Sequence, residues 1–263
     1  MKKIIPLLLF AATLFFAGCD PKQKDEVIDN AEPLVSQFIF DGMSAYYLWA
    51  DEMKNKKPNA ANEKDPSNYF KTLLNPLDTK NGWSWITDDV NALLADFSGT
   101  PKDFGWSLAL YRITGTNNVE GYVKYVFPNT PAANAGVKRG EVVHQIGGAT
   151  MTIDNYSKLF EGNTLSVGIG NYATSTTRTI SLTPVTIQTN PVLVDTVYKD
   201  KPEFAGKKIG YLFYTDFIGG YNPQLYSTFT DFKAQGITDL IIDLRYNHGG
   251  GIDAALYLAS LIA

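Results

Sequence analysis

The sequence predicts an α+β protein of more than one domain, because the residue pattern changes twice along the chain. Residues 34–100 carry apolar side chains at helical spacing, residues 101–186 contain several short strand-like runs, and residues 187–263 alternate strands with helices. The chain has 263 residues, of which 44% are apolar and 19% are charged. This length and composition suit one to two domains with sizeable cores and exclude wholesale disorder.

The first block is expected to be helical throughout. Apolar residues recur three and four positions apart from residue 34 to residue 53, and Asp65–Pro66 is a favourable N-cap and first position for a second helix. Thr87 is expected to cap a third helix, which Gly99 can end. The residues expected to face inward on that helix are Val90, Leu93, Leu94 and Phe97.

Residues 1–18 have the pattern of a secretory signal peptide: a basic start, an apolar stretch and two small residues. The only cysteine of the chain, Cys19, follows directly. This arrangement resembles a bacterial lipobox, in which the cysteine is lipidated and becomes the mature N-terminus. Residues 19–33 then form a lipidated tether that holds the protein on a membrane. The alternative is an ordinary signal peptide with a chance cysteine.

The middle block combines short strands with two small helical pieces near 131–135 and 153–160, a pattern that predicts a compact β-barrel-like module. The run PAANAGVKRGE, residues 131–141, closely resembles a segment of the PDZ family. The resemblance implies that Phe104, Gly105, Trp106, Ser107 and Leu108 form a carboxylate-binding loop. Backbone N–H groups there can hold a peptide C-terminus while the adjoining strand pairs with the peptide. The alternative is a structural β-module that binds nothing, with Phe104 and Leu108 as core.

The last block reads as strand, helix, strand, glycine loop and helix, which is an α/β layout. The strand from Asp239 is almost continuously apolar, as expected of a strand covered on both faces. Its end carries Asp243, Arg245 and Asn247, which are expected to fix the loop that follows. Gly249 and Gly250 can present N–H groups to an oxyanion at the N-terminus of the next helix. By itself the same loop also fits a phosphate site or a tight turn.

Several function classes are disfavoured by composition. The 23 basic and 27 acidic residues give a net charge of −4, which argues against nucleic-acid binding. One cysteine and two histidines leave little room for a metal site, and no dinucleotide or phosphate-loop fingerprint occurs. We therefore expect neither a metal nor another cofactor. His144 fits a structural histidine on an apolar strand, whereas His248 lies in the glycine loop.

The run KIGYLFY from Lys208 and the run DLIIDLRYNHGGG from Asp239 together resemble the carboxyl-terminal processing peptidases, or tail-specific proteases. Residues 47–49 and the SWITD run from Ser84 are similar to the N-terminal region of the Bacteroidetes-type lipoproteins of this family. The resemblance implies a serine endopeptidase of the Ser/Lys type, whose PDZ module delivers free C-termini of peptide or protein substrates. It implies a location in the cell envelope of a diderm bacterium, at the periplasmic or outer-membrane face.

The chain departs from that family in one respect. The nucleophilic serine and its lysine base are expected after the glycine loop and at least one more strand, and the sequence stops at Ala263. We therefore expect an inactive fragment of a longer chain, and Ser260 receives no catalytic role. The alternative function is a lipid-anchored PDZ protein that captures peptide tails without cutting them.

Overall fold

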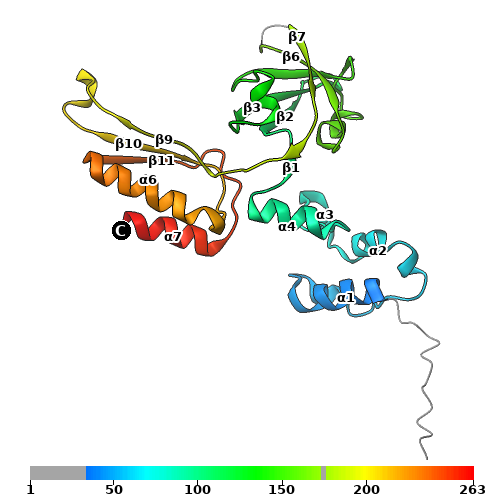
Figure 1. The fold of residues 1–263 in the computed structure, drawn as a ribbon. Coiled ribbons are helices and arrows are strands. Elements are labelled where there is room, and N and C mark those ends of the chain that lie inside the picture. Colours follow the sequence, from blue (N-terminus) through cyan, green and yellow to red (C-terminus); the bar gives the residue numbers. More distant parts are fainter. Residues whose placement is uncertain (1–33, 173–175) are drawn as a thin grey trace, which may run out of the picture. The chain divides into compact units, whose positions relative to one another are not determined.

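The computed structural model describes residues 34–172 and 176–263. These residues form two compact units, one ending at Thr87 and the other beginning at Asp88 (Figure 1). Both helices and sheets are present, in agreement with the predicted α+β class. The predicted signal peptide, Cys19 and the tether lie outside the described residues, and the predicted domain boundaries stay a prediction.

The first unit is helical. Its elements are α1 (Leu34–Tyr46), η1 (Ala50–Met53), η2 (Asn62–Lys64), α2 (Pro66–Leu73) and α3 (Pro76–Asn81). Asp65 caps α2 as predicted, since its carboxylate accepts the N–H of Asn68 at 2.9 Å. On α1, Ile39 faces the core, whereas Phe38 and Tyr46 are exposed.

Helix α4 (Val90–Ser98) opens the second unit and corrects two expectations. Asp89 rather than Thr87 is its N-cap, with the Asp89 carboxylate accepting the N–H of Ala92 at 2.9 Å. The apolar stripe does not face inward, because Val90, Leu94 and Phe97 are 58%, 57% and 67% exposed. An amphipathic pattern shows which face of a helix can be buried, but it does not show that the chain supplies a partner for that face.

The β-rich module follows. Its elements are β1 (Lys102–Asp103), β2 (Trp106–Arg112), β3 (Val119–Val126), α5 (Pro131–Asn134), β4 (Val142–Ile146), β5 (Ala149–Thr150), η3 (Tyr156–Phe160), β6 (Leu165–Gly170), β7 (Arg178–Leu182) and β8 (Val185–Thr186). Its core is built from alternate residues of these strands, among them Val123, Val143, Val167 and Ile169, together with Leu159 of η3.

The main sheet of this module has the order β2-β3-β4-β6-β7, with antiparallel pairing and β5 added to β4. The barrel-like module is not a closed barrel within the residues the structure describes, because the terminal strands β2 and β7 do not pair with each other. Closure requires such a pairing, together with a matching stagger, which a run of strand-like segments in a sequence does not specify. Strand β2 is therefore an edge strand.

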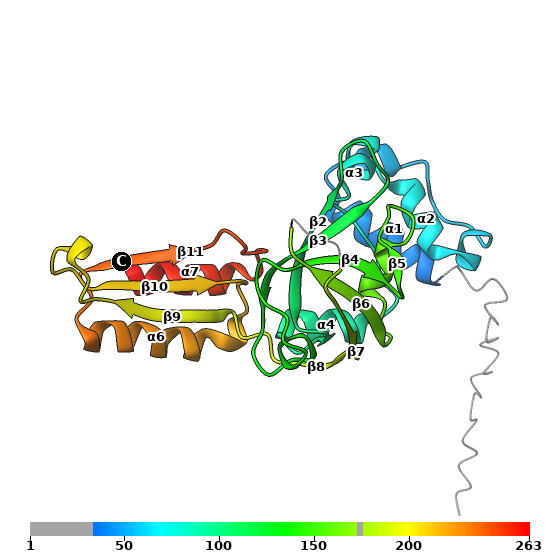
Figure 2. The same ribbon diagram turned by 90° about the horizontal axis from the view of Figure 1, so that it is seen from above.

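The α/β part completes the second unit. Its elements are β9 (Val192–Tyr198), η4 (Pro202–Phe204), β10 (Ile209–Tyr214), η5 (Gly219–Tyr221), α6 (Asn222–Gln235), β11 (Asp239–Asp243) and α7 (Ile252–Ile262). Strand β10 lies in the centre, antiparallel to β9 and parallel to β11. Helices α6 and α7 lie on one face of this sheet (Figures 1 and 2). Leu212, Tyr214, Leu225, Phe232 and Leu258 form the buried layer between them.

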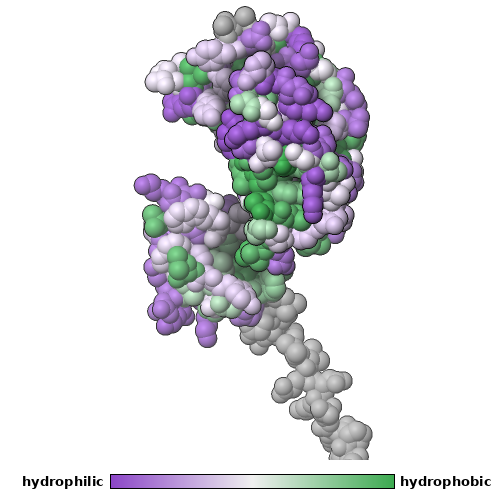
Figure 3. All heavy atoms as spheres, turned by 90° about the vertical axis from the view of Figure 1, so that its left-hand side faces the viewer, coloured by the Kyte–Doolittle hydropathy of each residue, from purple (hydrophilic) through white to green (hydrophobic). Residues whose placement is uncertain are grey.

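Strand β11 differs from its expected setting. Within the described residues it pairs only with β10, and Ile241 is 48% exposed. Ile252 and Leu256 of α7 are also exposed, and Figure 3 shows apolar side chains gathered in a patch on the face that it displays. No helix in residues 34–172 or 176–263 has both the length and the hydropathy required to cross a bilayer.

Candidate functional site

The loop after β11 is fixed at its base by Asp243. This carboxylate is buried and accepts hydrogen bonds from the Tyr211 hydroxyl at 2.7 Å and from the Arg245 guanidinium at 2.6 and 2.9 Å. The Arg245 guanidinium is the main cause that holds the pKa of Asp243 well below its usual range. A charged, bidentate pair of this kind sets the direction in which the chain leaves the strand.

Asn247 and Phe217 shape the loop itself. The Asn247 carboxamide donates to the Tyr214 carbonyl at 3.2 Å and accepts the N–H of Gly249 at 2.8 Å. The Phe217 N–H donates to the Gly249 carbonyl at 2.7 Å, and the Phe217 carbonyl accepts the N–H of Gly251 at 2.8 Å. Asp243, Arg245 and Asn247 thus hold the loop in place, as the sequence indicates.

Gly250 presents the free amide of this loop. Within residues 247–251, it is the N–H for which the described part of the chain offers no acceptor, whereas the Gly249 N–H is taken by Asn247. Gly250 has a φ of +131°, and an added Cβ would lie 2.4 Å from the Phe217 carbonyl oxygen, so only glycine fits. Helix α7 starts beside it without a side-chain cap, and its positive end favours an anion here. The oxyanion assignment of Gly249 and Gly250 stays a prediction.

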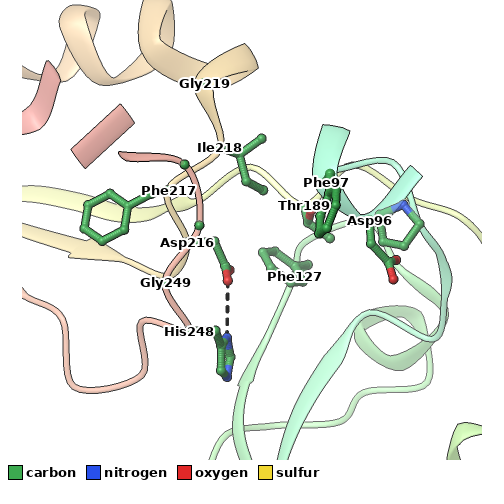
Figure 4. Close-up of a pocket in the computed structure, with 13 residues that line it drawn as sticks. Asp96, Phe97, Phe127, Thr189, Asp216, Phe217, Ile218, Gly219, His248 and Gly249 are labelled. Atoms are coloured by element: carbon green, nitrogen blue, oxygen red, sulfur yellow. Dashed lines mark ion pairs between the residues drawn. The ribbon is translucent and has the colours of Figure 1, made fainter. Parts of the chain in front are cut away.

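The glycine loop forms one wall of a pocket of about 680 Å³ (Figure 4). The other walls come from the segment after β10, from α4 and from the end of β3. The lining residues are Asp96, Phe97, Pro101, Phe127, Thr189, Asp216, Phe217, Ile218, Gly219, His248, Gly249, Gly250 and Gly251. A pocket of this size, apolar on one side and lined by backbone amides on the other, can hold part of a peptide.

His248 connects this loop to the β-rich module. Its Nδ1 lies 3.3 Å from the Asp216 carboxylate (Figure 4), and its Nε2 lies 2.9 Å from the Lys124 ammonium on β3. The imidazole thus lies between an ammonium on β3 and the carboxylate of Asp216. Burial lowers the pKa of Lys124. No signal in the sequence paired these three residues, which are far apart along the chain.

The expected carboxylate-binding loop divides into core and groove residues. Phe104 and Trp106 are buried in the core of the module, whereas Ser107 and Leu108 are partly buried on the edge strand β2. Gly105 has a φ of +87°, and an added Cβ would overlap the Thr130 side chain, so the position requires glycine. The assignment of these five residues to peptide binding stays a prediction.

A groove of about 530 Å³ runs beside this loop. Trp106 and Leu108 of β2 line one side, and Leu159 and Phe160 of η3 line the other, with residues of α4 at its margin. The Gly105 N–H is already engaged, because it donates to the Asp103 carboxylate at 2.5 Å. Sequence reasoning missed Asp103; the signal was an aspartate two residues before a glycine, a spacing that favours such a bond.

Two further predicted positions are structural. Glu141 accepts two hydrogen bonds from Arg178, at 2.9 and 2.8 Å, which tie the segment after α5 to β7. His144 lies 3.3 Å from the Glu120 carboxylate on the neighbouring strand. Neither lines a pocket described above. Within the described residues, no group of three or more His, Cys, Asp or Glu side chains is placed to hold a metal ion.

Two family models match the chain. The Peptidase S41 N-terminal domain matches residues 35–85, and Peptidase family S41 matches residues 208–263, the segment that contains the glycine loop. A Bacteroides fragilis protein assigned to the S41 proteases has a similar structure, with a TM-score of 0.53 and 27% identity over 83% of this chain and 57% of that one. The matched family models and this structure all carry the S41 peptidase description.

Two proteins with assigned names are similar to about half of this chain. A carboxyl-terminal-processing protease of Picosynechococcus sp. is 28% identical over 144 residues, which are 51% of this chain and 33% of the relative. A chloroplastic C-terminal processing peptidase of Tetradesmus obliquus is 28% identical over 147 residues, 51% of this chain and 32% of that relative. The match thus spans about a third of the length of these relatives. Both family models describe domains of peptidase family S41, and both relatives are carboxyl-terminal processing peptidases, so this is the family that the chain resembles.

Proposed function

We propose that this chain carries the substrate-binding and oxyanion-binding parts of a serine endopeptidase of the carboxyl-terminal processing type. The observation that carries the proposal is the free amide of Gly250 at the wall of the 680 Å³ pocket, inside the segment that matches the S41 model. A free N–H at a fixed position beside a helix N-terminus suits the negative charge that develops on a carbonyl oxygen during acyl transfer.

The β-rich module is proposed to act as a PDZ-type domain that receives the C-termini of peptide or protein substrates. Two observations support this role. Strand β2 is an edge strand, so its backbone can pair with an extended peptide. The groove beside it has apolar walls from β2 and η3 that suit the side chain of a terminal residue.

The 263-residue chain by itself is proposed to have no peptidase activity. Across residues 34–172 and 176–263, no serine hydroxyl is hydrogen-bonded to a lysine or histidine side chain, so no serine there has a base to activate it. Ser260 donates its hydroxyl proton to the Tyr257 carbonyl at 2.7 Å within α7.

The proposed location is the cell envelope of a diderm bacterium, with lipidated Cys19 as the anchor. The support is the sequence pattern of residues 1–19. Metabolic labelling with an alkyne-bearing fatty acid tests this proposal directly. We expect label on the wild-type chain and none on Cys19→Ser, because the thiol is the acceptor of the lipid; equal labelling of both would reject the anchor.

Reactivity with a fluorophosphonate probe tests the peptidase proposal. We expect no labelling of the 263-residue polypeptide, and labelling of a longer product wherever the reading frame continues past codon 263. In that longer product, Gly250→Pro deletes the free N–H and should lower turnover by about 10²–10³. Ser260→Ala is the matched control and should leave turnover unchanged. Heat-sensitive labelling of the 263-residue chain, or a folded Gly250→Pro enzyme with full turnover, would contradict the proposal.

A further inference from the structure

The carboxylate-binding loop already contains a carboxylate. Asp103 lies on β1, which β8 holds by the pairing of Asp103 with Val185. Its side chain turns back into the loop and accepts the N–H of Gly105 at 2.5 Å. An amide of the expected carboxylate-binding loop is thus engaged by an internal carboxylate.

The Gly105 amide is one that a peptide C-terminus would use in this loop. A terminal carboxylate needs two or more free N–H groups in one loop. It cannot share the Gly105 N–H with Asp103, because two carboxylates a few ångströms apart in a partly buried site repel strongly. The carbonyls of the loop are also engaged, since Phe104 accepts the N–H of Ala132 and Gly105 accepts the N–H of Phe127, at 2.9 and 2.8 Å. The loop backbone is therefore firmly held around Asp103.

The surrounding charges add to the repulsion. The same groove is lined by Asp89, Asp96 and Glu161, with Lys102 as the cationic side chain among its lining residues. Burial raises the pKa of Asp103, and the nearby charge of Asp96 raises it further. The Asp103 carboxylate is therefore held in an unfavourable environment, and its hydrogen bond from the Gly105 N–H compensates part of that cost.

We infer that Asp103 is an internal competitor of the substrate's C-terminal carboxylate and thereby sets the specificity of this groove. A free C-terminus binds only when the Asp103 side chain leaves the loop, so the wild-type groove discriminates poorly between a peptide acid and its amide. This inference rests on the proposed peptide-binding function of the β-rich module.

The test compares peptide acids with peptide amides on the whole 263-residue chain. The probe is a fluorescein-labelled decapeptide ending in valine, an apolar residue that suits the groove walls, prepared as the free acid and as the amide. Asp103→Asn keeps a side-chain oxygen that can accept the Gly105 N–H and removes the charge. Asp154→Asn is the control, because Asp154 is exposed on the same module and does not line the groove.

We expect Asp103→Asn to bind the acid peptide about tenfold more tightly than the wild type does, since the competing charge is gone. Binding of the amide should change by less than about twofold, and Asp154→Asn should behave like the wild type. A wild-type chain that strongly prefers the acid, together with unchanged binding by Asp103→Asn, would overturn the inference and leave the proposed function intact. Absence of binding to either peptide by all folded variants would overturn both.

Discussion

The two glycine loops of the second unit are built alike and present opposite charge environments. In each, an Asx side chain accepts the N–H of the glycine two residues later: Asn247 binds Gly249 at 2.8 Å, and Asp103 binds Gly105 at 2.5 Å. The first acceptor is a neutral carboxamide, and the loop continues to a further glycine whose amide is free. The second acceptor is a carboxylate, which engages the Gly105 amide of its loop. The two loops thus differ in the charge of the acceptor that lies two residues before the glycine.

Gly250→Ala is expected to have the largest effect on the folded state. The added Cβ would lie 2.4 Å from the Phe217 carbonyl oxygen at a φ of +131°, so the loop must shift. We expect the free energy of unfolding to fall by about 3 kcal/mol, as measured by urea denaturation. Gly249→Ala is the control: it meets no atom within 4 Å and should cost about 1 kcal/mol for its positive φ alone. Equal costs would show that the close approach to Phe217 is not decisive.

Asp243→Asn should weaken the base of the glycine loop by about 2 kcal/mol, because the Arg245 and Tyr211 hydrogen bonds lose their charged acceptor. The pKa of Asp243 is depressed in the folded state, so its contribution is present above the ordinary value of 3.8 and is lost as the pH falls toward the depressed value. Denaturation between pH 7 and pH 3 should show a shallower loss of stability for the variant. Parallel curves for the two proteins would contradict this account.

Asn247→Asp tests the comparison directly. It replaces the neutral carboxamide acceptor of the glycine loop with a carboxylate, the acceptor found at Asp103 in the other loop. The new carboxylate would still accept the hydrogen bond from the Gly249 N–H. It would have no N–H to donate to the Tyr214 carbonyl, and its negative charge would repel that carbonyl oxygen. We expect a loss of about 1–2 kcal/mol at pH 7, measured by denaturation and largely recovered at pH 3, where the carboxylate is protonated. A variant as stable as the wild type at pH 7 would show that the loop tolerates a charged acceptor.

Asp103→Asn, the reciprocal change, should have the smallest effect on stability and the opposite sign. Burial raises the pKa of Asp103 above 3.8, so the folded state binds this proton more readily than the unfolded state does. Stability from this group is therefore present at low pH and lost as the pH rises through the raised pKa. At pH 7 we expect the variant to be about 0.5 kcal/mol more stable in thermal melts, with no gain at pH 3. A clear destabilisation at pH 7 would mean that the carboxylate is needed to hold the loop.

The sequence by itself predicted many of the helices and strands, several helix ends, the resemblance to the carboxyl-terminal processing peptidases and the glycine loop. These features depend on local patterns: Asp65 before Pro66 starts a helix, Gly99 and Gly236 end helices in the left-handed conformation, and three glycines in a row mark an exposed backbone. The sequence also indicated that Asp243, Arg245 and Asn247 hold the loop, because they lie between the predicted strand and the three glycines.

The tertiary structure alone decided which amides are free and which surfaces are covered. That Gly250 rather than Gly249 presents an unpaired N–H depends on Phe217 and Asn247 closing the loop around it. The exposure of the α4 stripe and the open edge at β2 depend on strand order and packing between distant segments. Local pattern sets what a segment can form, whereas hydrogen-bond partners and buried faces come from residues far along the chain, whose approach no single window of sequence encodes.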